Sequence, residues 1–272
     1  MALALQTIGL VKRFGGIVAT NDFNFNLEAG ARHALIGPNG AGKTTLINLL
    51  TGVLQPSAGK VLLEGADITD LRPDQRVRRG LARTFQINQL FEKMTPLETI
   101  TLAVAERMAQ GGSWWRPAGT TAGMADEIAG IADRFHLSDV LDESTISLPY
   151  GRQRLLEIAV AFAAKPRVLL LDEPAAGVPE SERPDSLAAV AALPRDVTVL
   201  LIEHDMDLVF SFAEKITVMV NGTFLTEGTV DEISHDPRVR AVYLGEASLA
   251  EAPETTKTPE TTKTGASQEH RP

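Results

Sequence analysis

The first part of the chain alternates apolar and polar residues and then turns into longer apolar runs. Residues 1–36 predict β-structure, because DFNFNLEAG (22–30) alternates with a period of two and ends in a glycine turn. The segment ARHALIG (31–37) has the mostly apolar pattern of a buried strand and runs into a glycine-rich loop. The following KTTLINLLTG (43–52) predicts a helix that ends at its last glycine.

Strands and helices alternate along the rest of the chain. We expect a strand in GKVLLEGADIT (59–69), a helix over 72–82, helices within 96–137 interrupted at GGSWWRPAGTT (111–121), strands in VLLLDEP (168–174) and VTVLLIEHD (197–205), and a hairpin in ITVMVNGTFLTEGT (216–229) that turns at Asn221-Gly222. This alternation predicts an α/β fold with a mainly parallel sheet covered on both faces.

The last segment of the chain differs in composition. Residues 249–272 contain PETTKT twice and are rich in Pro, Thr, Glu and Lys. Such a segment buries too little apolar surface to offset the entropy of ordering, so we predict a disordered tail after a folded region over 1–248. A partner-binding tail is the alternative.

Composition and charge narrow the functional classes. The 272 residues, 44% of them apolar, suffice for one large domain or two small ones. The absence of cysteine excludes disulfides and thiolate chemistry, and the net charge of −9 argues against nucleic acid as a partner. We expect no signal peptide, and no apolar run approaches the roughly 18 residues of a membrane helix. Five arginines cluster and predict either a solvated helix face or a docking patch: Arg72, Arg76, Arg78, Arg79 and Arg83.

The segment GPNGAGKTT fills every fixed position of a phosphate-binding loop, G-x-x-x-x-G-K-[ST], between a predicted strand and a predicted helix. Glycines allow backbone N–H groups to surround phosphate oxygens, and the helix N-terminus adds partial positive charge. Lys43 is expected to reach the β- and γ-phosphates of ATP, and Thr44 to give its hydroxyl to Mg²⁺. The residues expected to bind the nucleotide here are Gly37, Pro38, Asn39, Gly40, Ala41, Gly42, Lys43, Thr44 and Thr45.

An acidic pair follows the apolar strand predicted at 168–171. Asp172, at the tip of that strand, is expected to hold Mg²⁺. Glu173 is placed to polarise a water molecule for in-line attack on the γ-phosphate, as a general base. Taken alone, such a pair is often only a turn; the phosphate-binding loop upstream favours the catalytic interpretation.

Over roughly residues 3–246 the chain resembles ATPase subunits of ABC transporters, with the motifs in the family's order. RTFQ supplies Gln86 and LIEHD supplies His204. The resemblance implies a P-loop NTPase fold with a mainly parallel core sheet, an antiparallel β subdomain and a helical subdomain at about 87–165. It also implies that Gln86 contacts Mg²⁺ or the attacking water, that His204 contacts the γ-phosphate, and that Phe14 stacks on adenine. For Phe14, a place in the core near a turn is the alternative.

The family's signature L-S-G-G-Q is altered here. LPYGRQRLLEIA (148–159) keeps Gly151 and the apolar helix behind it, but has Pro149 and Tyr150 where small residues are usual. Backbone N–H groups at the helix start, at Tyr150 and Gly151, are still expected to face the γ-phosphate held by the opposite subunit. Proline is tolerated at such a start. Pro179 stands where most of the family has an aspartate between the two sites.

Several segments resemble ATPases of branched-chain amino acid importers, and specifically the larger of that system's two ATPase subunits. They are 83–104, 148–159, 172–182, 200–222 and 242–246, together with an insert containing Trp114-Trp115. The resemblance implies an ATPase that powers uptake of branched-chain amino acids. An importer of urea, amides or aromatic acids is the first alternative, and a cytosolic ABC ATPase without a transport role is the second.

The resemblance also implies partners and a location. A second ATPase subunit, identical or different, is expected to join head to tail, and integral membrane permease subunits are expected to dock near Gln86. A periplasmic or lipid-anchored binding protein is implied indirectly, and nucleic acid is not. The chain is therefore expected at the cytoplasmic face of the inner membrane, held there through the permease.

Overall fold

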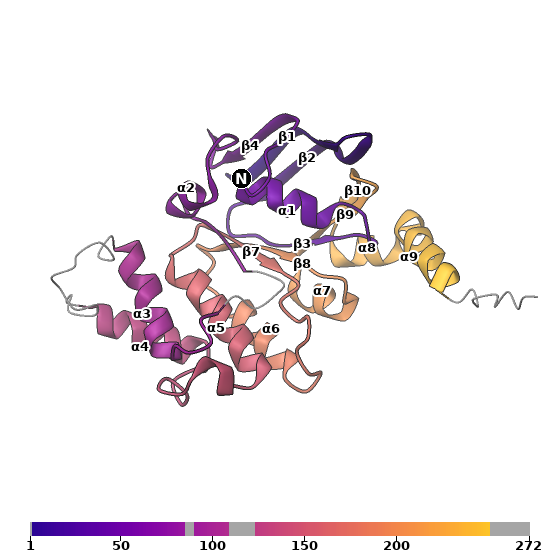
Figure 1. Ribbon diagram of the computed structural model, residues 1–272. Coiled ribbons are helices and arrows are strands. Elements are labelled where there is room, and N and C mark those ends of the chain that lie inside the picture. Colours follow the sequence, from indigo (N-terminus) through magenta and orange to yellow (C-terminus); the bar gives the residue numbers. More distant parts are fainter. Residues whose placement is uncertain (1, 85–89, 109–122, 251–272) are drawn as a thin grey trace, which may run out of the picture.

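The computed structural model describes residues 2–84, 90–108 and 123–250, and within them two sheets with helices arranged around the larger one (Figure 1). The larger sheet has six strands in the order β10-β9-β3-β8-β7-β6. Its strands are β3 (Arg32–Ile36), β6 (Leu81–Arg83), β7 (Val168–Asp172), β8 (Thr198–Ile202), β9 (Lys215–Val220) and β10 (Thr223–Gly228). All neighbours pair in parallel except β9 and β10.

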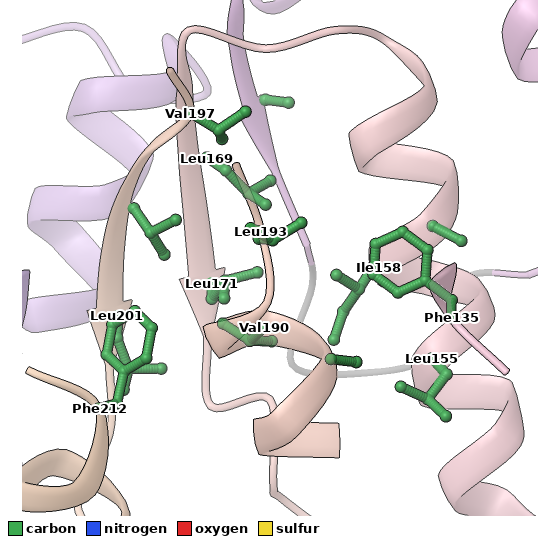
Figure 2. Close-up of a cluster of buried hydrophobic side chains, with 14 of the residues drawn as sticks. Phe135, Leu155, Ile158, Leu169, Leu171, Val190, Leu193, Val197, Leu201 and Phe212 are labelled. Atoms are coloured by element: carbon green, nitrogen blue, oxygen red, sulfur yellow. The ribbon is translucent and has the colours of Figure 1, made fainter. Parts of the chain in front are cut away.

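The parallel strands are buried on both faces, which explains their continuous apolar sequences. Along β7, Val168 and Leu170 contact the cluster that contains helix α1 (Lys43–Thr51), whereas Leu169 and Leu171 contact the opposite cluster. Figure 2 shows this opposite cluster of buried side chains. In addition to Leu169 and Leu171, it contains Phe135, Leu155 and Ile158. Because successive side chains of a strand point to opposite faces, the apolar run fills two cores at once.

The smaller sheet is antiparallel, with the order β2-β1-β4-β5. Its strands are β1 (Leu3–Phe14), β2 (Ile17–Glu28), β4 (Ala58–Leu63) and β5 (Ala66–Asp67). The alternation predicted for 22–30 is observed, since Phe23, Phe25 and Leu27 are buried and the residues between them are exposed. In Figure 1 helix α1 lies between this sheet and the six-stranded sheet.

The remaining helices of the described residues are α2 (Pro73–Arg78), α3 (Pro96–Arg107), α4 (Met124–Arg134), α5 (Tyr150–Ala163), α6 (Arg183–Ala191), α7 (Met206–Phe212), α8 (Val230–His235) and α9 (Pro237–Ala250), with a 3₁₀ turn at Thr145–Ser147. Helices α5, α6 and α7 lie on the other side of the six-stranded sheet, and α3 and α4 lie beside α5 (Figure 1). Within the described part of the chain no helix is long and apolar enough to cross a membrane.

The predicted α/β class, the parallel sheet and the hairpin at Asn221-Gly222 are confirmed. One prediction was wrong: the helix expected over 72–82 ends at Arg78, and residues 81–83 form β6, paired with β7. Gly80, with φ +94°, separates the helix from the strand, and the three residues of β6 are too few to show a period in the sequence. The subdomain boundaries stay predictions, and the predicted tail lies outside the described residues from position 251 onward.

The arginine cluster does not form one solvated face. The guanidinium of Arg76 is buried and donates to the carbonyl oxygens of Leu49 and Leu50 at 2.7 and 2.6 Å. Arg83 lies on β6 and pairs with Asp172. These two arginines are therefore structural contacts within the core, while Arg72 and Arg78 remain exposed.

Candidate functional site

The phosphate-binding loop connects the central strand β3 to the start of α1, as the sequence predicts. Gly42 has φ +104°, and a Cβ atom there would lie 2.5 Å from the carbonyl oxygen of Ala19 on β2. A Cβ atom on Gly37 would lie 2.1 Å from the carbonyl oxygen of Met219 on β9. The loop therefore passes so close to two strands that only glycine fits at these positions.

A cavity of about 410 Å³ lies over this loop, a volume suited to a small ligand. The Lys43 ammonium lies within the loop, where it donates to the carbonyl oxygens of Gly37 and, at 3.0 Å, Pro38. The described residues that line the cavity are Ile17, Val18, Ala19, Asn39, Gly40, Ala41, Gly42, Lys43, Thr44, Thr45, Glu173, Asn221 and Gly222. The structure thus brings Glu173 to the same cavity as the loop, although it lies 128 positions beyond Thr45 in the chain.

The β9–β10 hairpin is a part of this site that the sequence analysis did not place there. The N–H of Gly222 donates to the carbonyl oxygen of Ala41 at 2.8 Å, and the N–H of Asn21 donates to the carbonyl oxygen of Gly222 at 2.8 Å. The turn therefore joins the phosphate-binding loop to β2. No signal in the sequence links this turn to the loop, because the contact exists only after the strands pair.

Phe14 ends β1 and is 46% exposed, which excludes the alternative that it is a core residue. The Lys12 ammonium lies 5.2 Å from the centre of its ring, a cation–π contact. Ile17, three residues further on, is 70% exposed and lines the cavity. The exposed ring of Phe14 is thus only three positions along the chain from Ile17, a residue that lines the cavity.

Asp172 ends the buried strand β7, and its carboxylate is 6% exposed. Its Oδ2 accepts a hydrogen bond of 2.6 Å from Nη2 of Arg83. Nη1 of the same guanidinium donates to Oδ1 of Asn48 on α1 at 2.7 Å. The predicted metal-binding carboxylate is therefore held in place by an ion pair that the sequence analysis did not predict.

Glu173 adopts a left-handed backbone conformation, with φ +46°. Its N–H donates to the carbonyl oxygen of Ile202 on β8 at 2.9 Å. For a residue with a Cβ atom this conformation costs about 1–2 kcal/mol, so the surrounding contacts must hold it. Such strain is frequent at functional sites, and here it occurs at a residue that lines the cavity over the phosphate-binding loop and whose side chain is 20% exposed.

His204 follows β8 and is brought next to Glu173. Its Nδ1 lies 3.7 Å from Oε1 of Glu173 and 3.7 Å from Oε2 of Glu203, and the imidazole is 62% exposed. The three predicted elements, loop, carboxylate and histidine, thus converge at the carboxyl ends of parallel strands. This edge is where ligands bind in open α/β sheets. Gln86 lies outside the described residues.

Glu203 is a residue that the sequence analysis missed. It is 1% exposed, and its two carboxylate oxygens accept hydrogen bonds from the N–H groups of Ala175 and His204, each at 3.1 Å. Burial raises the pKa of Glu203, while these two N–H donors act in the opposite direction. The Glu203 carboxylate therefore connects the segment after β7, which contains Glu173, to the segment after β8, which contains His204.

The altered signature forms the start of α5. Pro149 is the N-cap residue of this helix and provides no side-chain cap. The N–H of Gly151 donates to Oε2 of Glu182 at 3.0 Å, and the Tyr150 ring packs against Gly177. Among the described residues that line the cavity, none comes from α5, so Tyr150 and Gly151 lie apart from this chain's own phosphate-binding loop.

Comparison with known families agrees with this geometry. A family model described as "ABC transporter" matches residues 20–176, which include the phosphate-binding loop and the acidic pair. The chain belongs to the ABC transporter ATPase family. It is therefore an ABC-type ATPase, and the expected fold is confirmed. A second model, "Branched-chain amino acid ATP-binding cassette transporter", matches residues 225–248.

The chain aligns with individual relatives over nearly the whole length of each relative. The chain is 40% identical over 250 residues to the high-affinity branched-chain amino acid transport ATP-binding proteins BraF of Pseudomonas aeruginosa and LivG of Escherichia coli, covering 89% of this chain and 98% of each relative. It is also similar to a solved ATP-binding cassette of an ABC transporter in its ADP conformation. That match has a TM-score of 0.78 and 31% identity, and it covers 90% of this chain and 99% of that one.

Proposed function

We propose that this chain is the ATP-hydrolysing subunit that powers uptake of branched-chain amino acids through an ABC importer. The observation that carries the ATPase mechanism is the cavity that Glu173 shares with the phosphate-binding loop. The cargo rests on the relatives, which are named as branched-chain amino acid transport proteins, and on the second family match at 225–248.

ATP binds with its phosphates over the loop from Gly37 to Thr45. The loop's N–H groups, the N-terminus of α1 and the Lys43 ammonium all favour phosphate oxygens. Lys43 already donates to two loop carbonyl oxygens, so it stands where the β- and γ-phosphates arrive. The exposed ring of Phe14 stacks on adenine.

The residues present fit Mg²⁺, a hard cation that prefers oxygen ligands. Thr44 lines the cavity, and Asp172 directly precedes Glu173, which also lines it. Thr44, Asp172 and Gln86 would hold the ion. When bound, Mg²⁺ neutralises charge on the β- and γ-phosphate oxygens.

Hydrolysis needs a water molecule in line with the bond from the γ-phosphorus to the bridging oxygen of ADP. The Glu173 carboxylate takes the proton of that water as its oxygen attacks phosphorus, and ADP departs. His204, 3.7 Å from Glu173, contacts the γ-phosphate and orients it. Glu203 accepts hydrogen bonds from the segments that carry Glu173 and His204, and these bonds hold the two segments at a fixed distance from each other.

Two ATPase subunits assemble head to tail, so that each nucleotide lies between one phosphate-binding loop and the partner's signature. The place of Tyr150 and Gly151 away from this chain's own loop supports such an arrangement. The partner is a second copy or a different ATPase subunit. Pro149 and Pro179 alter the site that this chain completes, so a dimer with a different ATPase subunit hydrolyses ATP unequally at its two sites.

The permease docks on a cleft of about 1,230 Å³ whose lining includes Arg83, three positions before Gln86 in the chain. The cleft lies between elements of the sheet region and of the predicted helical subdomain, including Arg83 of β6, Ala103 of α3 and Val160 of α5. A groove lined by two subdomains transmits their relative movement to whatever helix occupies it. The chain thereby sits at the cytoplasmic face of the membrane through the permease, and an external binding protein delivers the amino acid.

Uptake of labelled solutes by cells lacking this chain tests the proposal. The panel contains leucine, isoleucine, valine, urea and aromatic acids, and the wild-type chain or Glu173→Gln is added back. Branched-chain uptake should be lost and restored by the wild type alone. Loss of another solute instead would keep the ATPase role and change the cargo, and unchanged uptake of every solute would contradict a transport function.

A further inference from the structure

Arg154 of the signature helix α5 is bound to the backbone of the candidate hydrolysis site. Its Nη2 donates to the carbonyl oxygens of Asp172 and Glu173 at 2.8 and 2.9 Å, and its Nε donates to the carbonyl oxygen of Pro174 at 3.1 Å. Nη1 donates to Oε2 of Glu157, one turn further along the helix. The Arg154 side chain is fully buried, so these bonds are made away from water.

These bonds fix the orientation of Glu173. The carbonyl groups of Asp172 and Glu173 belong to the two peptide planes on either side of the Glu173 Cα atom, and that residue has φ +46°. Two planes with fixed orientations determine the backbone dihedrals between them. Arg154 therefore stabilises the strained backbone conformation of Glu173, the residue that lines the cavity together with the phosphate-binding loop.

Arg154 also lies on the element that begins with the altered signature. It follows Gly151 by three residues, less than one helical turn. Arg154 contacts the first residues of the segment that runs from Asp172 to Glu182. At the last residue of that segment, Oε2 of Glu182 accepts a hydrogen bond from the N–H of Gly151 at 3.0 Å. The segment from Asp172 to Glu182 is thus attached to α5 near both of its ends.

We propose that Arg154 is a positioning residue for Glu173, and that it links the signature helix to the hydrolysis site of the same chain. The inference rests on the proposed ATPase mechanism. Any displacement of α5, when its start meets a nucleotide on the partner, moves the guanidinium and with it the peptide planes around Glu173. Hydrolysis in one site then depends on the position of the helix that serves the other.

Arg154→Lys in the assembled transporter tests the inference. Lysine keeps the charge, but a single ammonium does not reproduce a planar fork with three carbonyl partners and a carboxylate. We expect kcat to fall roughly 10- to 100-fold, as for a reacting group misplaced by about 1 Å. The KM for ATP should stay within about twofold, because the phosphate-binding loop is unchanged.

Arg32→Lys is the matched control. Arg32 is also a buried arginine, and its guanidinium donates to the carbonyl oxygens of Val197, Leu193 and Pro194 at 2.7, 2.5 and 3.2 Å. Those carbonyls lie at the far end of α6 and not at the hydrolysis site. This variant should lower the melting temperature as Arg154→Lys does, while its kcat stays at the wild-type value. An equal loss of kcat in both variants would overturn the inference, because general destabilisation would explain it.

A double-mutant cycle distinguishes positioning from a separate structural role. If Arg154 acts through Glu173, then Arg154→Lys should cost almost nothing further in a Glu173→Gln background, measured by single-turnover hydrolysis. Fully additive losses would overturn the inference. If Arg154→Lys does not fold, Glu157→Gln replaces it: weakening this charge-assisted bond should lower kcat severalfold at constant KM, and an unchanged kcat would contradict the inference. Absence of ATPase activity in the wild-type complex would instead contradict the proposed function itself.

Discussion

The guanidinium of Arg83 and the carboxylate of Asp172, the last residues of the parallel strands β6 and β7, form an ion pair of 2.6 Å with side chains only 11% and 6% exposed. The pair connects two neighbouring strands at the residue that precedes Glu173 of the candidate hydrolysis site. A charge buried to this extent depends on its partner, because water does not replace the lost contact.

Replacing Arg83 with Met should therefore destabilise the fold strongly. We expect the free energy of unfolding to fall by about 3–5 kcal/mol, since Asp172 is left as an uncompensated buried charge. Urea denaturation measures the change. Arg195→Met is the control, because Arg195 pairs with Glu214 at 2.7 Å with side chains 67% and 54% exposed. Exposed pairs contribute at most about 1 kcal/mol, so equal effects of the two variants would contradict the role assigned to burial.

Glu173→Gln should retain ATP binding and lose turnover. Removing a general base costs about 10²- to 10⁴-fold in rate, whereas the loop that binds the phosphates is untouched. Phosphate release and equilibrium binding of ATP are the two measurements. Glu143→Gln, at an exposed position outside the cavity, serves as the control and should hydrolyse ATP like the wild type. Unchanged turnover of Glu173→Gln would remove Glu173 from the role of base.

Gly42→Ala should weaken ATP binding, because the new methyl group would lie 2.5 Å from a backbone oxygen at φ +104°. Strain of this kind costs about 1–3 kcal/mol, and relieving it distorts the loop, so we expect affinity to fall about tenfold or more. Isothermal titration with ATP measures this.

Gly130→Ala is the control for Gly42→Ala. Gly130 lies in the exposed interior of α4, and nothing lies within 4 Å of its added Cβ atom. Here alanine should leave ATP affinity unchanged and raise the free energy of unfolding by about 0.5–1 kcal/mol. If both alanine variants bound ATP normally, the close approach at Gly42 would have no functional meaning.

His33 should make stability depend on pH. Burial lowers the pKa of His33 from 6.5 to about 4 in the folded chain. Between pH 6.5 and about 4, therefore, the imidazole of His33 is protonated in the unfolded chain but not in the folded chain. The free energy of unfolding consequently falls as pH drops from about 6.5 towards 4. Above that window the imidazole is neutral in both states and contributes no pH dependence.

The magnitude follows from the shift and amounts to about 3 kcal/mol by the lower end of the window. His33→Gln should flatten the profile by this amount, because glutamine does not titrate. Its side-chain amide also replaces the hydrogen bond of 2.8 Å between Nε2 of His33 and Oγ1 of Thr217. Denaturation midpoints at pH 7, 6, 5 and 4.5 give the comparison, and identical profiles of wild type and His33→Gln would exclude this role for burial.

Local sequence determined the elements that carry the chemistry. The glycine spacing of 37–45 and the acidic pair at the end of an apolar strand are properties of adjacent residues, and backbone sterics and strand burial act on them directly. The order of the motifs was therefore enough to predict an ABC-type ATPase, its fold class, and the convergence of Lys43, Glu173 and His204 at one edge of the sheet.

Tertiary structure alone decided what holds these residues in place. Arg154, Glu182 and Glu203 look like ordinary charged residues in the sequence, because their partners are carbonyl and N–H groups as many as 31 positions away. Arg76 and Arg83 looked like members of a solvated cluster, yet Arg76 is buried and Arg83 pairs with Asp172. A backbone group has the same chemistry at every position, so only the packing of strands and helices determines which one a buried side chain meets.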